Sequence, residues 1–361
     1  MTELFAATAP VFKIDGELKS ELARDVTFLR IEEATDGLKT LVLRLLAEGP
    51  RPNEREEGQL YLDGETIDFG KSVEVSIGPA DAARIVFNGA VSAIEAEFVS
   101  GVVPAVSVFA EDALMALRMT RRMKTYENLS DAGIAESIAN EHGLAVEANA
   151  DGPTYKVVQQ WNQSDLAFLR ERARLIQAEL WLADNTLHFA TRGNRTATTL
   201  TLVLGYNLLE AQLRADLAHQ RTVVKVSGYD AARREGITEE AGADEIQLEV
   251  SGGRTGIAVL RQAFGERESY RVRGNALVSG EARAWARGEM LRRARNFVTI
   301  SGTTSGTADM VVGSRVSLEN VGAPFTGDGY YVTRVCHTYD LVEGFRTHFD
   351  AERPTVNEGA A

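Results

Sequence analysis

Residues 161–182 have the sequence WNQSDLAFLRERARLIQAELWL, and this stretch decides how the chain is organised. Ser164 is a favourable N-cap, because its hydroxyl can accept a hydrogen bond from the N–H groups that the first helical turn leaves without partners. Apolar residues then recur at spacings of three and four, at Leu166, Leu169, Ala173 and Ile176. This pattern predicts a helix whose apolar stripe packs on a sheet.

The residues after this helix predict a β-hairpin. Two strand-like runs, Glu179–Ala183 and Thr186–Phe189, are separated only by Asp184-Asn185, and both of these residue types tolerate the left-handed backbone of a tight turn. Upstream, Ser130 as N-cap and Gly143 after the last turn predict another helix over about residues 131–141. Residues 118–197 therefore read as an α/β region.

Strand patterns lie on both sides of this region. Before it, alternating or β-rich runs are separated by Gly, Pro and Asp turns, at Val26–Glu33, Thr40–Leu46, Val73–Ile77, Ile85–Val91 and Val102–Phe109. A polar stretch at 47–58 suits a surface loop, and good helix formers occupy 111–117. After it, strands are predicted at Thr199–Leu204, Thr222–Ser227 and within Val298–Phe349, and a helix rich in arginine at Ser279–Phe297.

These patterns predict an α+β chain that is mainly β. The expected domains are a first β domain at 1–117, an α/β insertion at 118–197, and a second β domain at 198–278 and 298–352. A helical insertion occupies 279–297, and a flexible tail occupies 353–361. A chain of 361 residues is long enough for two or more hydrophobic cores.

Composition excludes several classes of function. The formal net charge of -13 would repel a phosphate backbone, so specific nucleic-acid binding is not expected. Cys336 is the only cysteine, which rules out an internal disulfide and a thiolate metal cluster. The N-terminus carries Glu3 where a secretory signal needs basic residues. The longest uncharged stretches, Phe98–Ala110 and residues 196–210, are too short for a membrane helix, so no membrane insertion is predicted.

No pattern of catalytic or metal-binding residues emerges. His142, His188, His219, His337 and His348 lack the spacing of a helical zinc site, although His337 and His348 could approach each other across a hairpin. No Gly-x-Ser-x-Gly motif occurs, and carboxylates cannot be paired from sequence alone. We therefore predict no catalytic, cofactor-binding or metal-binding residues, no cofactor and no enzymatic activity.

Three other features have both a functional and an ordinary interpretation. The glycine-rich segment Ser251–Gly256 lacks the Lys and Ser/Thr of a phosphate loop, which favours a plain loop. Trp161, Trp181 and Trp285 could form a carbohydrate platform, but buried anchors at domain contacts fit them better. The arginines at 287, 292, 293 and 295 could meet an acidic partner or form a solvated helix face, and the second interpretation is favoured.

Two segments carry a family resemblance. The first is the helix beginning Trp161-Asn162-Gln163-Ser164-Asp165 together with the aromatic strand that follows it. The second is Gly329-Tyr330-Tyr331-Val332, leading through His337 to Gly344-Phe345-Arg346-Thr347-His348-Phe349. Both resemble the phage late control D and valine-glycine repeat protein G (VgrG) hub family. Weaker matches at Phe87–Val91, Val106–Asp112 and Tyr126–Ser130 follow in the expected order, so the resemblance spans roughly residues 85–350.

The resemblance implies two related antiparallel β-barrel domains with an α/β insertion and a homotrimeric ring. It also implies a baseplate hub that joins a sixfold inner tube to a threefold spike, in contact with other baseplate components. The chain would be made in the bacterial cytoplasm and become part of a phage tail or injection-system particle. Because no needle-like repeat follows residue 350, the spike is expected to be a separate polypeptide.

Two alternatives from other classes stay open. A tail-associated cell-wall hydrolase would need a cleft with converging carboxylates or a metal, and a carbohydrate-binding β module would need exposed aromatic residues. Neither alternative predicts the ordered motifs.

Overall fold

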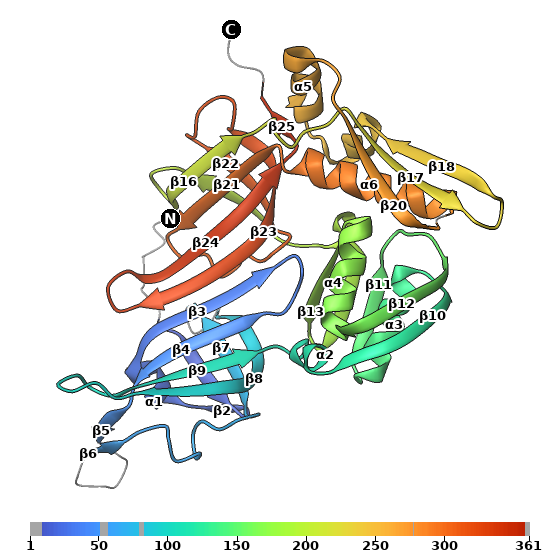
Figure 1. Cartoon of the computed structure of the whole chain (residues 1–361). Helices are drawn as coiled ribbons and strands as arrows, with labels where there is room; N and C mark the ends of the chain where they lie inside the picture. Colours follow the sequence, from blue (N-terminus) through green and yellow to red (C-terminus); the bar gives the residue numbers. More distant parts are fainter. Residues whose placement is uncertain (1–8, 51–56, 79–82, 277, 358–361) are drawn as a thin grey trace.

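The computed structural model describes residues 9–50, 57–78, 83–276 and 278–357. Figure 1 shows an N-terminal β unit in blue and teal, an α/β region in green, and a C-terminal β unit in red that is accompanied by a yellow and orange α/β part. The predicted class, α+β and mainly β, is confirmed.

The elements occur in the following order. The first β unit contains β1 (Val11–Ile14), β2 (Glu17–Leu18), α1 (Ser20–Asp25), β3 (Val26–Ala34), β4 (Thr40–Leu46), β5 (Glu48–Pro50), β6 (Glu57–Gln59), β7 (Ser72–Ile77), β8 (Arg84–Glu97) and β9 (Ala105–Glu111). The α/β region contains α2 (Met115–Met119), β10 (Arg121–Leu129), α3 (Asp131–Glu141), β11 (Ala145–Asn149), β12 (Tyr155–Ser164), α4 (Asp165–Ile176), β13 (Ala178–Ala183), β14 (Thr186–Thr191) and the short helix η1 (Arg192–Asn194). Then follow β15 (Thr199–Val203), β16 (Leu208–Ala215), β17 (Val223–Asp230), β18 (Glu235–Ala241), η2 (Ala243–Glu249), β19 (Arg254–Thr255), α5 (Gly256–Phe264), β20 (Glu268–Ala276), α6 (Ser279–Arg295), β21 (Val298–Thr304), β22 (Arg315–Glu319), β23 (Gly327–Asp340), β24 (Gly344–Arg353) and β25 (Thr355–Val356).

The two β units repeat one topology. Neighbouring strands run β3-β4-β9-β8-β7 in the first unit and β16-β21-β24-β23-β22 in the second, and both sets appear in the same order along the chain. Even the bulges coincide. Ser92 is the extra residue in β8 and Thr333 in β23, while Thr27 is the extra residue in β3 and Leu209 in β16. The chain therefore contains two copies of one five-stranded unit.

Strand β23 joins the two units. One edge of β23 pairs with β24, while its other edge pairs first with β22 and then, from Arg334 to Asp340, with β3. A 13-stranded sheet thus runs through both units. No ladder among the described strands closes either unit on itself, so we describe them as five-stranded units and not as the barrels that were predicted.

The α/β region forms as the local signals predict. Helices α3 and α4 begin where their N-caps were expected, since the Oγ atoms of Ser130 and Ser164 accept hydrogen bonds from Gly133 and Ala167. Strands β13 and β14 form the expected hairpin, and Asp184 and Asn185 have φ values of 46° and 60°. This left-handed pair is the turn that twisted antiparallel strands require.

Replacing Ser164 by alanine should lower the free energy of unfolding by about 1 kcal/mol, because the first turn of α4 loses its side-chain acceptor. Ser164→Asp should keep most of the stability. Urea unfolding of the three proteins tests this. Equal stability of Ser164→Ala and wild type would show that the cap is dispensable.

One sheet assignment was wrong. Strands β17, β18 and β20 were expected in the second β domain, but they form a separate three-stranded sheet. Helix α6 covers this sheet, and the two share one hydrophobic core with the α/β region. The physical reason is that Val224, Val226 and Ile237 find their apolar partners on α6, including Ala282 and Ala286.

The chain beyond residue 352 was predicted as a flexible tail, and this is wrong for residues 353–357. Arg353 is 2% exposed, and its guanidinium donates to the carbonyls of Pro324, Thr326, Asp328 and Thr355. Strand β25 pairs with β19. Residues 358–361 lie outside the described part of the chain.

Two smaller predictions were partly right. The polar stretch at 47–58 contains the short pair β5 and β6, and residues 51–56 lie outside the described residues. The helix predicted over 111–117 begins only at Met115, because β9 continues to Glu111. No helix in the described ranges is both long enough and apolar enough to cross a membrane.

Candidate interaction site

A buried ionic junction holds the two β units and the α/β region together. Arg195, with a side chain only 5% exposed, donates to Glu33 of β3 at 2.8 Å and to Glu179 of β13 at 3.2 Å. Lys39 pairs with the other oxygen of Glu33 at 3.0 Å. Burial acts to raise the pKa of Glu33, but Lys39 and Arg195 outweigh it and hold that pKa below its usual value.

Arg192 extends the junction into the second β unit. Its guanidinium donates to Glu352 of β24 at 2.5 Å and lies 3.9 Å from the centre of the Tyr331 ring. Tyr331 in turn donates its hydroxyl to Glu179 at 2.6 Å. Three parts of the chain therefore meet through charged groups that compensate one another in a region shielded from water.

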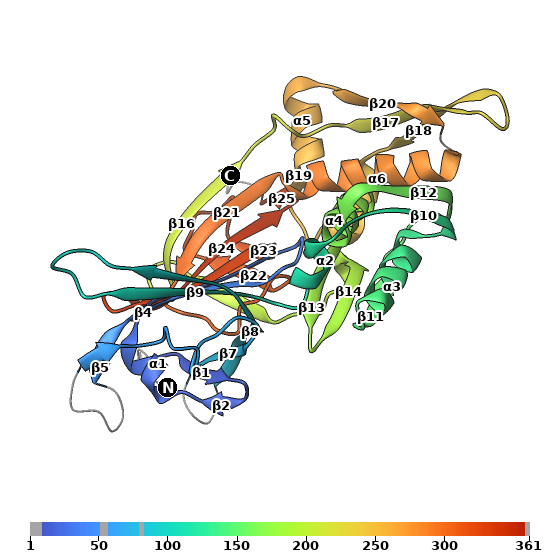
Figure 2. The same ribbon diagram turned by 60° about the horizontal axis from the view of Figure 1, so that its bottom comes forward.

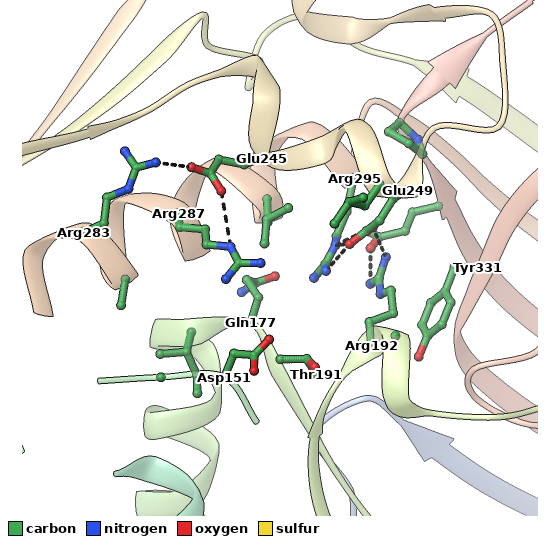
Figure 3. Close-up of a pocket in the computed structure, with 18 of the residues that line it drawn as sticks. Asp151, Gln177, Thr191, Arg192, Glu245, Glu249, Arg283, Arg287, Arg295 and Tyr331 are labelled. Carbon is green, nitrogen blue, oxygen red and sulfur yellow. Dashed lines mark hydrogen bonds and ion pairs between the residues drawn. The ribbon is translucent and has the colours of Figure 1, made fainter. Parts of the chain in front are cut away.

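A cleft of about 840 Å³ opens beside this junction, between α6, η2, β14 and the second β unit. Figure 3 shows α6 carrying Arg283, Arg287 and Arg295 along one wall. Glu245 of η2 pairs with Arg283 and Arg287, and Glu249 pairs with Arg295 at 2.5 Å. The cleft walls are thus held by ion pairs within the chain.

These contacts correct part of the interpretation of the arginines on α6. Arg287 and Arg292 are 46% and 52% exposed, as a solvated helix face predicts, whereas Arg293 and Arg295 are largely buried. All four pair with a carboxylate of the same chain, namely Glu245, Glu249 or Glu289.

The carboxylates of the cleft do not resemble a glycosidase pair. A general acid needs a raised pKa, whereas the hydrogen bonds from Arg295 outweigh burial and lower the pKa of Glu249. Burial raises the pKa of Asp112 to about 6, but that carboxylate accepts from the backbone N–H groups of Lys39 and Leu114. Asp131, whose pKa burial also raises, is held by Arg172 and Tyr155.

The other residues considered from sequence are dispersed. His337 and His348 are close in register across β23 and β24, but each makes its own hydrogen bond to a threonine, Thr347 and Thr338 respectively. Within the described residues no group of three or more His, Cys, Asp or Glu side chains could hold a metal ion. Burial raises the pKa of Cys336.

His337 predicts a pH dependence of stability. Burial lowers its pKa to about 4, so between pH 6.5 and 4 the unfolded chain binds a proton that the folded chain does not, and stability falls as the pH falls. Asp112, with its raised pKa, acts in the opposite direction. Urea unfolding at pH 7 and pH 4 should show the wild type losing about 3 kcal/mol more than His337→Asn. Equal losses would contradict the assignment.

The tryptophans and the glycine-rich segment also have structural explanations. Trp285 is buried as expected, but Trp161 is 63% exposed, so the anchor interpretation is wrong for Trp161. The Gly256 N–H donates to Pro354, and a Cβ on Gly253 would lie 2.3 Å from the carbonyl oxygen of Val356. Gly253 therefore allows close approach of the C-terminal strand, and the amide of Gly256 is not free to hold a phosphate.

The exposed surface offers two kinds of contact site. Both long hairpins end in exposed apolar residues, namely Phe98, Val99, Val102 and Val103 between β8 and β9, and Leu341 and Val342 between β23 and β24. Both tips project from the same end of the sheet, because Asp340, Phe28, Arg44 and Ser107 lie in one row across β23, β3, β4 and β9 (Figures 1 and 2). The second kind of site is a strand edge that lacks a partner strand within the described ranges, as at β16 and at the second half of β8.

Comparison with known protein families assigns the chain to one of them. The family described as the Alg8 N-terminal domain matches residues 54–340, which is most of the chain. The chain belongs to the Alg8 N-terminal domain family. That description names a domain and no activity. No curated protein matches the sequence.

Solved structures similar to this Alg8 N-terminal domain chain come from phage tails and a secretion system. The 43 kDa tail protein of prophage MuSo2 from Shewanella oneidensis has a TM-score of 0.69 at 17% identity, over 96% of this chain and 98% of its own. A tail protein from Neisseria meningitidis has a TM-score of 0.63 at 14% identity, over 96% of each chain. An Escherichia coli component of the type VI secretion system has a TM-score of 0.58 at 12% identity, over 97% of this chain and 79% of its own. At these identities the likeness establishes the fold, which is that of phage tail proteins.

Proposed function

We propose that this chain is the central baseplate hub of a contractile tail or contractile injection system. In this role it forms a homotrimer that joins a sixfold inner tube to a threefold spike or spike-tip protein. The observation that carries the proposal is the internal repeat. Two equivalent five-stranded units in each of three chains would present six similar units to the tube and three identical chains to the spike.

The two hairpin tips are the proposed contact with the tube. They belong to equivalent hairpins of the two units, and both carry exposed apolar side chains. Three strand spacings separate β23 from β9, which corresponds to about 14 Å. A trimer would place six apolar tips on one face, where a sixfold ring could cover them all.

The buried junction supports a mechanical role for the whole chain. Glu33, Glu179 and Glu352 belong to three different parts of the fold and meet two arginines there. Separating those parts would break several mutually compensating ion pairs at once, so the parts should move as one body. The proposed role needs no cofactor, metal or catalytic residue. Synthesis and assembly in the bacterial cytoplasm are part of the proposal.

The domain boundaries are a further proposal. We retain 1–117 and 118–197 for the first two domains. The strand pairings support a second β unit made of 198–215 and 298–352, with residues 216–297 as an inserted α/β part. This insertion lies between β16 and β21, whose equivalents β3 and β4 are joined by the short connection of residues 35–39.

Electron microscopy of the native particle, purified through a tag on this chain, tests the proposal. We expect three copies of the chain at the joint between tube and spike, with the hairpin tips against the tube. A chain that remains monomeric in light scattering when mixed with its tube and spike proteins would contradict the trimer. Turnover of peptidoglycan by the purified chain would favour the cell-wall hydrolase, and glycan binding would favour the carbohydrate module.

A further inference from the structure

The internal repeat shows which strand edges lack a partner. Within the chain, the outer edge of β3 pairs with the second half of β23, from Arg334 to Asp340. The equivalents of these two strands are β16 and β8. Among the described residues, β16 pairs with β21 and otherwise makes only an isolated bridge at its first residue, between Leu208 and Leu204. The corresponding edge of β8 has no strand partner beyond Val91 among these residues. Inside the chain, the pairing of β3 with β23 joins the two units. The equivalent edges, those of β16 and of the second half of β8, remain available for the same kind of pairing.

We propose that β16 of one subunit pairs antiparallel with the second half of β8 of the next subunit. This inference rests on the proposed homotrimer, and it adds the identity of the interface. Each subunit would contribute one edge of each kind, so the contact is head to tail and can close into a ring. The sheet would then pass from subunit to subunit as it passes from unit to unit within one chain.

The register of this pairing follows from the matched bulges. Ser92 is equivalent to Thr333, so Glu95 is equivalent to Cys336, three residues further along. Leu209 is equivalent to Thr27, so Arg214 is equivalent to Glu32. Because Cys336 lies directly opposite Glu32 within the chain, Glu95 should lie directly opposite Arg214 of the next subunit.

The residues brought together by this register complement each other in charge. Both Glu95 and Arg214 are exposed, and the Arg214 side chain has 74% of its area open and forms an ion pair with Asp216 at 2.5 Å. Opposite charges on directly facing positions stabilise an antiparallel pair. Nothing in the choice of register used charge, so the match of Glu95 with Arg214 is an independent observation.

The apolar residues agree with the same register. The next facing pair is Ala96 with Leu213, equivalent to the buried pair His337 and Ile31 inside the chain. Ala96 is exposed and Leu213 is only partly buried against the core of the second unit. The neighbouring strand would cover both, as it covers their equivalents.

Disulfide trapping in the assembled particle tests the pairing. Directly opposite Cα atoms in antiparallel strands are about 4.5–5.5 Å apart, which is within the range that a disulfide spans. A chain carrying both Glu95→Cys and Arg214→Cys should, on oxidation, run as covalent dimers and trimers on a non-reducing gel. Either variant alone should stay monomeric on the gel, because the contact is head to tail.

The matched control combines Glu95→Cys with Arg233→Cys. Arg233 lies in the β17–β18 turn and is 72% exposed in its side chain, nearly the same as Arg214, so its thiol is equally accessible. This control should give at least tenfold less cross-linked product. In parallel, Glu95→Arg or Arg214→Glu alone should weaken trimer association measured by sedimentation, and the double exchange should restore it.

The outcomes separate this inference from the proposed function. A particle that contains three copies of the chain but gives no more cross-linking for the 95/214 pair than for the 95/233 control would overturn the strand pairing and leave the trimer intact. A chain that is monomeric with its partners present would overturn both.

Discussion

Replacing Arg195 by methionine is expected to lower the free energy of unfolding by about 3–5 kcal/mol, the range typical of breaking a buried ion pair from one side. Methionine fills similar volume but leaves Glu33 and Glu179 without their shared cation. The loss of charge compensation therefore dominates over the loss of packing. Because these carboxylates belong to β3 and β13, the effect should destabilise the contact between the first β unit and the α/β region.

Urea unfolding followed by tryptophan fluorescence measures this loss. Arg195→Lys should recover only part of it, because one ammonium group cannot reproduce the two-sided contact of a guanidinium. Arg233→Met is the matched control, since the Arg233 side chain is 72% exposed and lies at 3.9 Å from Asp230 and 3.8 Å from Glu235, so its loss should change stability by less than about 0.5 kcal/mol. Similar losses for Arg195→Met and Arg233→Met would show that the junction contributes nothing beyond surface charge.

Gly288→Ala should destabilise the chain by about 2–3 kcal/mol, although alanine is normally the better helix former. Gly288 lies where α6 crosses the end of α4, and a Cβ there would be 2.3 Å from the carbonyl oxygen of Leu175. That oxygen belongs to the backbone, so no side-chain rotation relieves the clash and the two helices must move apart. The core that they share would lose its close packing.

Gly280→Ala provides the control within the same helix. No atom lies within 4 Å of the Cβ position at Gly280, so the substitution should be neutral or stabilise α6 by up to about 1 kcal/mol. Thermal unfolding of both variants and the wild type gives the comparison. If Gly288→Ala melts at or above the temperature of Gly280→Ala, the close approach of α6 to α4 is not required.

The features that could be predicted from the sequence are those set by residues close together in the chain. Ser130 and Ser164 cap α3 and α4 because each hydroxyl reaches an N–H group three residues away. Asp184 and Asn185 set the β13–β14 hairpin because only a two-residue left-handed turn fits between its strands. Such signals depend little on the rest of the molecule.

The features that could not be predicted depend on partners far apart in the chain. Arg192 and Glu352 are separated by 160 positions, and no local pattern marks either as buried. Strands β17, β18 and β20 have ordinary strand composition. Their sequence therefore does not reveal that they pack on α6 as a separate sheet and do not join the large sheet. The internal repeat was implied only by the family resemblance. It is hidden in the residues themselves because equivalent positions differ in residue type, as with Leu29 and Ala211, and because the insertion at 216–297 interrupts the second copy.

Strand β23 has a consequence for changes in chain length. Its first half packs in the core of the second unit, where Tyr330 and Val332 lie, while its second half runs beside β3 of the first. Successive residues of a strand face opposite sides of the sheet. Deleting or adding one residue before Arg334 would therefore move every later side chain of β23 to the opposite face of the sheet. An insertion or deletion there would disrupt two cores at once, whereas the turn at residues 341–343 could absorb one. Selection on this gene should therefore tolerate substitutions along β23 far better than shifts in its length.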